Sequence, residues 1–404
     1  MEINFFVEGR YCYLVPHPPF ILVEQLKRGL SYTKKNSQFL SNPSWGVVKL
    51  YDEKRHRYPI GLHFLVQKII GLADIPSLVR PDNVFYGILR LYQRDALDAM
   101  LKHSHGILSI PTGGGKTRVA LQYMKNVPVP TLVLVPTLDL VSQWEKQVPE
   151  FAHVKTYQSI KKKDYLAQFK AVIFDECHHV AAKTLYRIGI NLSANTSVFG
   201  LSATPLLRDD DNLKVQAVLG QIIYKVSNAE LTRQGYLAKC KIHMIDTLQP
   251  YDAPLHLSYA GVYEAYIISN QERNETIKDL VKTLTGRTLI LVNRIFHGVM
   301  LNALIPESIF LSGQSSKELR DNPDADVIIA TQIYDEGVDM PDLNNLIVAG
   351  GGKSQIKTIQ RVGRTLRPHA DKPHANVYDF YDKTKWLDKH SRERKKVYDD
   401  CFGD

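Results

Sequence analysis

The sequence predicts an α/β protein in which a small α+β module precedes two successive parallel-sheet lobes. From about residue 89 onward, short apolar runs alternate with stretches of helical periodicity. That alternation is typical of a parallel sheet covered by helices on its faces. It is interrupted by a less regular stretch near residues 230–270 and then resumes. We therefore predict an N-terminal module at 1–88, a first lobe at 89–230 and a second lobe at 231–404.

The first 88 residues are rich in aromatic and mixed segments. Glu8-Gly9-Arg10 lies between two aromatic runs and predicts a hairpin turn. Helical spacing of apolar residues predicts two helices, and a charged loop lies between two predicted strands. The helices are expected at Phe20–Leu30 and Phe64–Leu72, and the strands at Gly46–Tyr51 and Arg57–Leu62.

Strands are expected wherever the two lobes contain a short apolar run. In the first lobe these runs are Gly106–Ile110, Thr131–Val135, Ala171–Phe174 and Ser197–Leu201. In the second lobe they are Thr288–Val292, Ser308–Leu311, Asp326–Ala330 and Asn344–Val348.

Composition favours a soluble globular protein with a polyanionic partner. Of the 404 residues, 44% are hydrophobic and 23% are charged, which allows a packed core. Lys and Arg total 51 against 42 Asp and Glu, for a net charge of +9. Such an excess suits nucleic acid, because cationic side chains release the counterions that condense on phosphates. A basic protein without such a partner has the same balance.

Cysteine spacing and apolar run length restrict the compartment. The four cysteines lie far apart, without a CxxC pair, so neither a zinc site nor a disulfide framework is expected. No apolar run approaches the roughly 18 residues that span a bilayer. We expect a cytoplasmic or nucleoid-associated monomer with no membrane partner.

A glycine-rich turn in the first lobe predicts a nucleotide site. The turn Gly113-Gly114-Gly115 follows an apolar strand, and Lys116 and Thr117 open a helix. Glycines let backbone N–H groups converge on phosphate oxygens, and a helix N-terminus favours negative charge. Lys116 can reach the terminal phosphates of ATP, and the Thr117 hydroxyl can ligate Mg²⁺. The strict pattern has Gly or Ala at position 110, where this chain has Ile.

Two carboxylates are expected opposite that turn. Asp175 and Glu176 end an apolar strand, at the sheet edge where α/β proteins bind ligands. Asp175 is expected to hold Mg²⁺ through water, and Glu176 to orient or deprotonate the attacking water. His178 is a candidate for coupling hydrolysis to movement. Gln93, at the start of a predicted helix, is a candidate for reading the adenine edge.

Together these residues resemble superfamily 2 helicases over residues 89 to about 380. The resemblance implies two tandem RecA-like lobes that use ATP and Mg²⁺. Beyond the nucleotide motifs, Ser202-Ala203-Thr204 is similar to motif III and Val133–Trp144 to motif Ia. Leu289–Asn293 resembles motif IV.

Motifs V and VI complete the order in the second lobe. Residues 331–341 resemble motif V, and Gln360-Arg361-Val362-Gly363-Arg364-Thr365-Leu366-Arg367 matches motif VI. The resemblance implies nucleotide contacts from Gly337 and Asp339 and a catalytic role for Gln360. Arg364 and Arg367 lie three apart on a predicted helix and face the same way. They are predicted to act as arginine fingers on the transition-state charge.

Finer features resemble particular branches of the superfamily. Residues 205–210 are similar to the Arg-Glu-Asp element of XPB-type repair helicases, with Asp209 in place of Glu. Lys49–Asp52 and Arg57–Leu62 look like the leading domain of UvsW-type phage helicases and their bacterial relatives. These branches imply work on forked and branched DNA with 3′-to-5′ polarity, in recombination, replication or repair.

A motor must grip the backbone without reading bases, so small polar groups are candidate contacts. The predicted nucleic-acid contacts are Thr137, Gln143 and Tyr157 in the first lobe, Ser312, Gly313 and Thr331 in the second, and Arg55 and Arg57 in the module. Arg392, Arg394, Lys395 and Lys396 lie on a C-terminal helix, where we expect solvated charge.

The leading hypothesis is an ATP-dependent DNA helicase or branch-migration translocase. A double-strand DNA translocase that leaves strands paired has the same motifs. An RNA helicase also remains open, because no residue visibly rejects a 2′-hydroxyl. A non-catalytic ATP-binding clamp conflicts with the intact Lys116, Glu176, Arg364 and Arg367.

Overall fold

The computed structural model describes residues 3–34, 47–75, 81, 83–160, 163–206, 211–247, 256–316, 318–319, 323–331, 340, 342–352, 362–363 and 374–402. By its internal contacts the chain forms two compact units. The first unit comprises residues 1–110 and 115–226, and the second comprises residues 111–114 and 227–404. None of the helices that the structure describes is long and apolar enough to cross a membrane.

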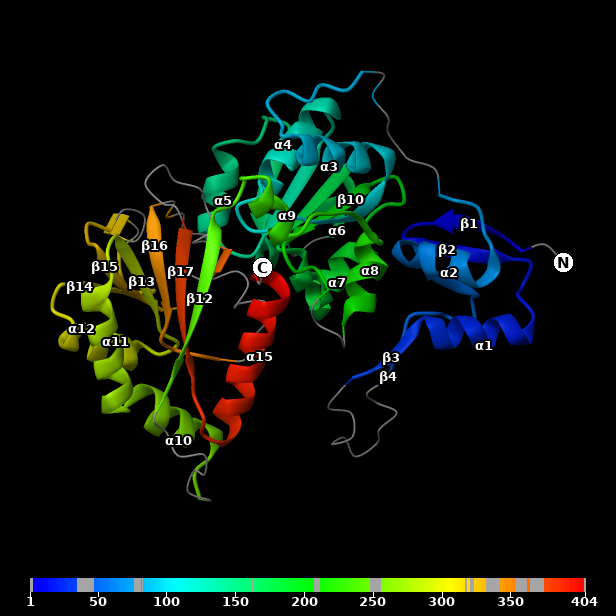
Figure 1. Ribbon diagram of the computed structural model, residues 1–404. Helices are drawn as coiled ribbons and strands as arrows, with labels where there is room; N and C mark the ends of the chain where they lie inside the picture. Colours follow the sequence, from blue (N-terminus) through cyan, green and yellow to red (C-terminus); the bar gives the residue numbers. More distant parts are fainter. Residues whose placement is uncertain are drawn as a thin grey trace. The chain divides into compact units, whose positions relative to one another are not determined.

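The N-terminal module is a three-stranded antiparallel sheet with two helices, and a short strand pair lies beside it (Figure 1). Its elements are β1 (Asn4–Glu8), β2 (Tyr11–Val15), α1 (Phe20–Gly29), β3 (Ser31–Thr33), β4 (Val47–Lys49), β5 (Arg57–Pro59), η3 (Ile60–Leu62) and α2 (His63–Ile70). The predicted hairpin and both helices are confirmed. Both later strands are present but shorter than their predicted ranges; β4 pairs with β3, and β5 pairs with β2.

The module shares a core with lobe 1, the α/β domain that runs from α3 to β11. Ala217 of lobe 1 belongs to the same buried cluster as the module's apolar side chains. Arg10, 1% exposed, donates a hydrogen bond to the Val218 carbonyl at 2.7 Å. Gly61 lies so close that a Cβ there would come within 2.2 Å of the Gln216 oxygen. Only glycine permits this approach, so the module and lobe 1 form one unit.

Lobe 1 is built on a six-stranded parallel sheet in the order β11-β6-β10-β9-β7-β8. Its elements are α3 (Leu91–Lys102), β6 (His105–Ser109), α4 (Lys116–Asn126), β7 (Thr131–Val135), α5 (Leu138–Glu145), β8 (Ala152–Thr156), η4 (Tyr157–Ser159), α6 (Lys163–Ala167), β9 (Ala171–Asp175), η5 (Cys177–Ala181), α7 (Lys183–Ile190), β10 (Ser197–Ser202), α8 (Asn212–Leu219) and β11 (Ile222–Lys225). Strands β7, β9 and β10 are buried along their whole length, as expected of central parallel strands.

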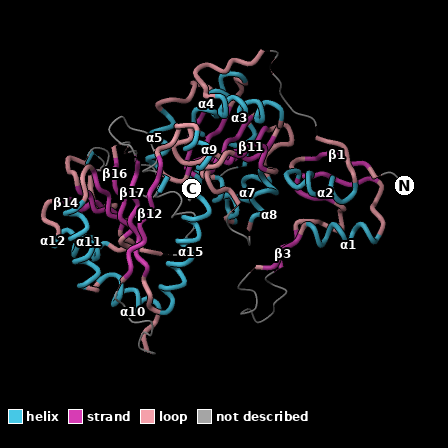
Figure 2. Tube along the Cα trace, viewed as in Figure 1, coloured by secondary structure: helices cyan, strands magenta, loops and turns pink. Residues whose placement is uncertain are grey.

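Lobe 2, from α9 to α15, has a second six-stranded parallel sheet in the order β12-β17-β16-β13-β15-β14 (Figure 2). Its elements are α9 (Asn228–Arg233), β12 (Lys239–Asp246), α10 (Tyr259–Tyr263), the π-helical η6 (Glu264–Ile268), α11 (Gln271–Thr283), β13 (Arg287–Leu291), α12 (Ile295–Leu304), β14 (Ser308–Leu311), β15 (Val327–Ala330), β16 (Leu343–Val348), β17 (His374–Tyr381) and α15 (Lys385–Phe402). The predicted fold class is thereby confirmed.

Part of the interval near 230–270 is more regular than the sequence indicated. It contains the eight-residue strand β12, which pairs with β17 along its whole length. Strand β12 alternates between exposed and half-buried positions because it lies at the edge of the sheet. An edge strand lacks the continuous apolar run by which the central strands were recognised.

Candidate nucleotide site and nucleic-acid contacts

Three neighbouring strands of lobe 1 end at one edge of the sheet. Strand β10 lies between β6 and β9, and its last residue, Ser202, aligns with Ser109. Its neighbour Leu201 aligns with Asp175 of β9. Parallel strands present their carboxyl ends together, so the glycine turn, the carboxylates and the Ser202 segment all start from this edge.

The glycine turn has the backbone that its sequence requires. Gly113 and Gly115 both have φ of +80°, which non-glycine residues rarely adopt. A Cβ on Gly115 would come within 2.4 Å of the Gln93 amide nitrogen. Gln93 is buried, and its Oε1 accepts a hydrogen bond from the Arg90 backbone N–H at 3.0 Å. The structure thus places Gln93 against the turn, and its contact with adenine stays a prediction.

Lys116 occupies the start of α4 with only 9% of its surface exposed. Its ammonium donates to the Ile110 carbonyl at 3.2 Å. Ile110 is itself fully buried, and its N–H donates to the Ser202 carbonyl at 3.2 Å. The departure from the strict pattern at position 110 is therefore a buried strand end that leaves the turn intact.

The two carboxylates are held differently. Asp175 accepts the Glu176 backbone N–H on Oδ1 at 3.0 Å and the Trp144 indole N–H on Oδ2 at 2.9 Å. Burial and the neighbouring Glu176 charge raise the pKa of Asp175. Burial also opposes the charge on Glu176, but the His178 hydrogen bond and the Lys116 charge outweigh it and lower the pKa of Glu176. Glu176 has φ of +46°, a strained backbone that appears directly at the strand end.

A small network connects Glu176 to the Ser202 segment. The Ser202 hydroxyl lies 3.4 Å from Glu176 Oε2 and 3.3 Å from His178 Nδ1. It also accepts the Thr204 backbone N–H at 3.1 Å. His178 is 2% exposed, and its Nδ1 lies 3.5 Å from Glu176 Oε2. A shift of the Glu176 carboxylate is therefore transmitted through the Ser202 hydroxyl to the backbone of residues 202–204.

This set of groups fits a magnesium nucleotide. A buried ammonium faces two carboxylates, and the half-buried Thr117 follows at the helix start. Among the described residues, no group of three or more His, Cys, Asp or Glu side chains could hold a metal by itself. Mg²⁺ commonly binds one or two carboxylates and completes its shell with phosphates and water, so this arrangement suits it.

Of the predicted nucleic-acid contacts in lobe 1, one must be corrected. Tyr157 is 5% exposed, and its hydroxyl donates to the Asp175 carbonyl and, at 3.3 Å, to the Glu176 carbonyl. It is therefore a core residue behind the carboxylates. Thr137 caps α5 by accepting the Leu140 N–H at 3.3 Å, and Gln143 is exposed on the same helix.

In lobe 2, the predicted contacts follow two neighbouring strands. Leu311, the last residue of β14, aligns with Ala330 of β15. Gly313 is exposed just beyond β14, and Thr331 follows β15 and donates its N–H to the Leu311 carbonyl at 3.1 Å. Ser312 is buried, and its hydroxyl accepts the Gln314 N–H at 3.3 Å. Gly337, Asp339, Gln360, Arg364, Arg367 and the 207–210 element lie outside the described residues.

Comparison with known families decides the identity. Residues 87–165 and 150–207 match the family model of the type III restriction enzyme res subunit, and residues 312–369 match the helicase conserved C-terminal domain. The chain is 28% identical to the DNA 3′-5′ translocase XPB2 of Sulfurisphaera tokodaii, over 79% of this chain and 88% of that protein. It is 26% identical to the ATP-dependent DNA helicase uvsW of Enterobacteria phage T4, over 76% and 70%. This chain is a superfamily 2 helicase of the UvsW/XPB type. It is accordingly an ATP-dependent enzyme.

Solved structures support the fold of this helicase. A fragment of a putative HsdR subunit of a type I restriction enzyme from Vibrio vulnificus YJ016 aligns with a TM-score of 0.62. The alignment covers 100% of this chain and 91% of that one at 16% identity. At this identity the likeness shows a shared fold and nothing about substrate.

The two arginines of the N-terminal module that were predicted to contact nucleic acid differ in their exposure and in their partners. Arg55 is exposed. Arg57 is instead held by Asp52 at 3.1 Å and by the Tyr13 hydroxyl at 2.9 Å, over the Tyr11 ring at 4.3 Å. Asp52 thus neutralises the Arg57 charge, and the predicted contact of Arg57 with nucleic acid stays a prediction.

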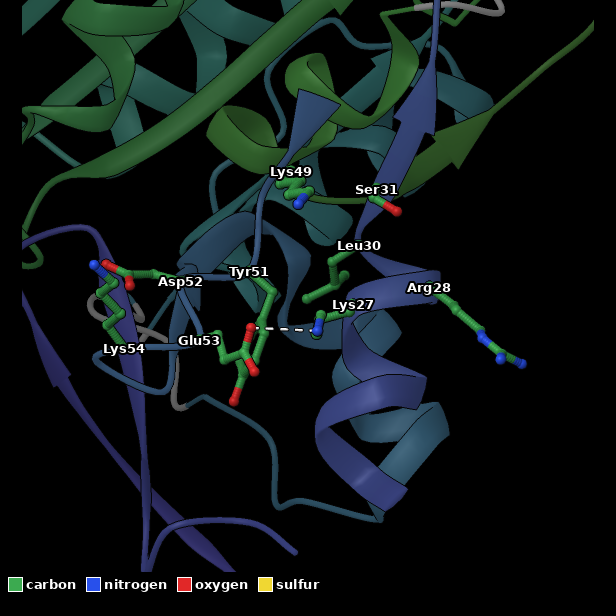
Figure 3. A pocket seen from close by; sticks show the side chains of 9 residues that line it. All are labelled: Lys27, Arg28, Leu30, Ser31, Lys49, Tyr51, Asp52, Glu53 and Lys54. Carbon is green, nitrogen blue, oxygen red and sulfur yellow. Dashed lines mark ion pairs between the residues drawn. The ribbon is translucent and has the colours of Figure 1, made fainter. Parts of the chain in front are cut away.

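A hollow of about 460 Å³ lies beside this loop, between α1 and β4. Figure 3 shows the Lys27–Glu53 ion pair at this hollow, whose lining also includes Lys54 and Asp52. The cations that line the hollow are Lys27, Arg28, Lys49 and Lys54. Lys27 is neutralised by Glu24 and Glu53, so Arg28, Lys49 and Lys54 are the residues that add to the basic surface predicted from the sequence.

Two further residues were missed by sequence reasoning. Trp144 bonds directly to Asp175, but its sequence signal, a single aromatic in a short helix, indicates only core packing. Arg394 was expected in solvent, yet it is 2% exposed and pairs with Asp379 at 2.6 Å. No charge pattern distinguishes it from the exposed Arg392 nearby.

Proposed function

We propose that this helicase acts on DNA, and that it unwinds or branch-migrates forked and junction DNA with 3′-to-5′ polarity. The observation that carries the proposal is the cluster of Lys116, Asp175 and Glu176 with the bonded Ser202 segment behind it. The named activities of the XPB2 and uvsW relatives support DNA as the substrate and support the polarity.

Hydrolysis is assigned to side chains of lobe 1. Lys116 turns from the Ile110 carbonyl to the terminal phosphates. Asp175 and Thr117 would hold Mg²⁺, and the bound ion would supply charge neutralisation on the phosphates. Glu176, with its lowered pKa, stays ionised and orients the attacking water. Gly113–Gly115 cradle the phosphates, and Gln93, Gly337 and Asp339 complete the nucleotide contacts.

Movement follows from the groups bonded to Glu176. When its carboxylate loses the water it orients, the bonds to Ser202 and His178 are the first to readjust. Ser202 passes this change to Thr204 through the backbone N–H. We assign charge stabilisation in the transition state to Arg364 and Arg367, with Gln360 beside them in sequence.

Grip on the DNA backbone is assigned to small polar groups that make and break contacts in each cycle. In lobe 1 these are Thr137 and the exposed Gln143, and in lobe 2 they are Gly313 and Thr331. In the N-terminal module, Arg55 and the cations of the adjacent hollow attract the duplex arms of a junction. Such contacts carry no sequence preference, as a motor requires.

A second candidate is a double-strand DNA translocase that leaves strands paired. It is favoured by the name of the XPB2 relative, which is a DNA 3′-5′ translocase. Recombination, replication and repair are the pathways in which either activity would serve.

The deciding experiment compares three substrates with one enzyme preparation. Phosphate release and strand displacement are measured on a fork, a Holliday-type junction and an overhang duplex, alongside displacement of a triplex-forming strand. The proposal expects DNA-stimulated ATP turnover, with strand separation or junction migration. Triplex displacement without strand separation would favour the translocase, and equal stimulation by RNA would overturn the assignment to DNA.

A further inference from the structure

Helix α5 packs against β7 and β8 of lobe 1 and buries one side chain there. All eight of its residues are described, and Trp144 alone among them is buried. At the other end, Leu138 is 75% exposed, while Gln143 is exposed next to Trp144. Because the Trp144 ring is the buried part of α5, a shift of the helix moves that ring.

The Trp144 ring is hydrogen-bonded to the carboxylate of Asp175. The Trp144 indole N–H donates to Asp175 Oδ2 at 2.9 Å, and the two residues are 2% and 7% exposed. Buried indole N–H groups require a partner, and a charged acceptor makes the stronger bond. Since Asp175 Oδ1 is fixed by the neighbouring Glu176 N–H, the bond from α5 is the one that sets the rotation of the carboxylate from outside its own strand.

A second link runs parallel to the first. Tyr157, in η4 just after β8, donates to the main-chain carbonyls of Asp175 and Glu176. Helix α5 packs on β8 as well as on β7. Helix α5 and the segment after β8 thus both bond to the Asp175–Glu176 pair, the first through the Asp175 side chain and the second through the main chain.

We propose that Trp144 is a positioning residue that couples nucleic acid held along α5 to the carboxylate that binds Mg²⁺. The inference rests on the proposed function, because it takes α5 as a nucleic-acid contact. Nucleic acid on the Gln143 side fixes α5, and the indole then fixes Asp175 in the rotamer that accepts the metal. Binding energies are reciprocal, so the magnesium nucleotide tightens nucleic-acid binding by the same factor.

The test measures that factor in the full-length chain with Trp144→Phe. Anisotropy of a methylanthraniloyl derivative of non-hydrolysable ATP gives its affinity in Mg²⁺, with and without a saturating forked DNA. The wild type is expected to bind the analogue at least about fivefold tighter with DNA, and Trp144→Phe less than about twofold tighter. Affinity for DNA in the absence of nucleotide should be unchanged, and the variant should need more Mg²⁺ for half-maximal ATP turnover.

Two controls keep this result interpretable. Trp386→Phe makes the same substitution at a tryptophan of lobe 2 that is 36% exposed, and it should retain the wild-type coupling. If Trp144→Phe does not fold, benzothienylalanine at 144 keeps the ring shape without the N–H and should show the same loss. Wild-type coupling in a folded variant without the N–H overturns the role of Trp144 alone. No effect of DNA on the wild type contradicts the proposed function and the inference with it.

Discussion

The two lobes bury charge in opposite ways. In lobe 1, like-charged Asp175 and Glu176 lie side by side with a single buried ammonium, Lys116, acting on both. In lobe 2, Arg394 forms two bonds to Asp379, while Arg273 pairs with Asp382 at 3.0 Å. The first arrangement leaves carboxylate charge to be neutralised by a ligand, whereas in the second each buried guanidinium is paired with a carboxylate of the same lobe. Buried charge marks chemistry in lobe 1 and architecture in lobe 2.

The buried Arg394–Asp379 pair in lobe 2 also holds helix α15 in place. Arg394 donates to the Gly352 carbonyl at 2.7 Å and to the Phe380 carbonyl at 3.0 Å, and the Tyr398 hydroxyl donates to Asp379. Burial opposes the guanidinium charge, but Asp379 beside it raises the pKa of Arg394 overall. Helix α15 is thereby fastened to β17 and to the turn after β16.

The largest effect that separates the lobes is expected from Lys116→Ala. Removing the ammonium deprives the phosphates of their buried cation, so ATP turnover should fall at least about 100-fold. DNA binding and the thermal unfolding temperature should change little. Phosphate release measures the loss, and Lys125→Ala, at an exposed lysine of the same helix, is the matched control. Unfolding of Lys116→Ala would instead assign this lysine to architecture, as in lobe 2.

The converse substitution in lobe 2 is Arg394→Met. Leaving Asp379 buried without its partner should destabilise lobe 2 by about 3–5 kcal/mol. Urea unfolding followed by Trp386 emission measures it, in a background in which Trp45 and Trp144 are replaced by Phe, because Trp386 lies in α15. Arg392→Met, where the side chain is 67% exposed and pairs with Asp388, should change the free energy of unfolding far less, because solvent screens an exposed ion pair. Equal effects of the two substitutions would contradict the buried-pair interpretation.

A pH titration sharpens the comparison at His297 of α12. The side chain is fully buried with Nε2 at 3.0 Å from Asn274 Oδ1, and burial, aided by Arg273, lowers its pKa to about 3. In the unfolded chain, His297 binds a proton when the pH falls below its ordinary pKa of about 6.5. In the folded lobe, the buried side chain stays neutral over the same range. Lobe 2 should therefore lose stability as pH falls from about 6.5 toward 3, by about 1.4 kcal/mol per unit from this group.

The measurement is the urea midpoint of the Trp386 signal between pH 7 and 5. His297→Gln removes the titration and should flatten the pH dependence by the contribution of one proton. An unchanged slope in the variant would show that His297 is protonated in the folded lobe.

The smallest effect is expected in the N-terminal module. Arg55→Ala should reduce the salt dependence of junction binding by a slope of about 0.9, as expected for one lost phosphate contact. Arg57→Ala should leave that slope unchanged, since Asp52 already neutralises Arg57. Fluorescence anisotropy with a labelled junction at several salt concentrations distinguishes the two, with basal ATP turnover as the control. A larger change of slope for Arg57→Ala than for Arg55→Ala would instead support Arg57 as the residue that contacts a phosphate.

What the sequence could predict followed from local rules. The glycine turn and the strand ending in Asp175 were recognisable because backbone conformation and apolar runs are encoded within a few residues. The edge strand β12 was missed because half of its side chains face outward. Trp144 and Arg394 were missed or misjudged because their partners lie 31 and 15 residues away, a distance that no local pattern reports.

Tyr157 also shows that a local sequence pattern does not report how a side chain packs. It stands where a family resemblance places a strand contact, but its hydroxyl is taken by the Asp175 carbonyl. Resemblance fixes the position of such a residue in the chain, and only packing decides which way its side chain points.

The most direct test of the central claim measures phosphate release by the full-length chain with and without forked DNA, for the wild type and for Glu176→Gln. The substitution keeps the size of the side chain and removes the charge that orients water. Forked DNA should increase the rate of phosphate release by the wild type about tenfold or more, a typical size for coupling between two sites. Glu176→Gln should bind DNA and nucleotide but release almost no phosphate. A wild-type rate indifferent to DNA, or undiminished turnover by Glu176→Gln, would contradict it.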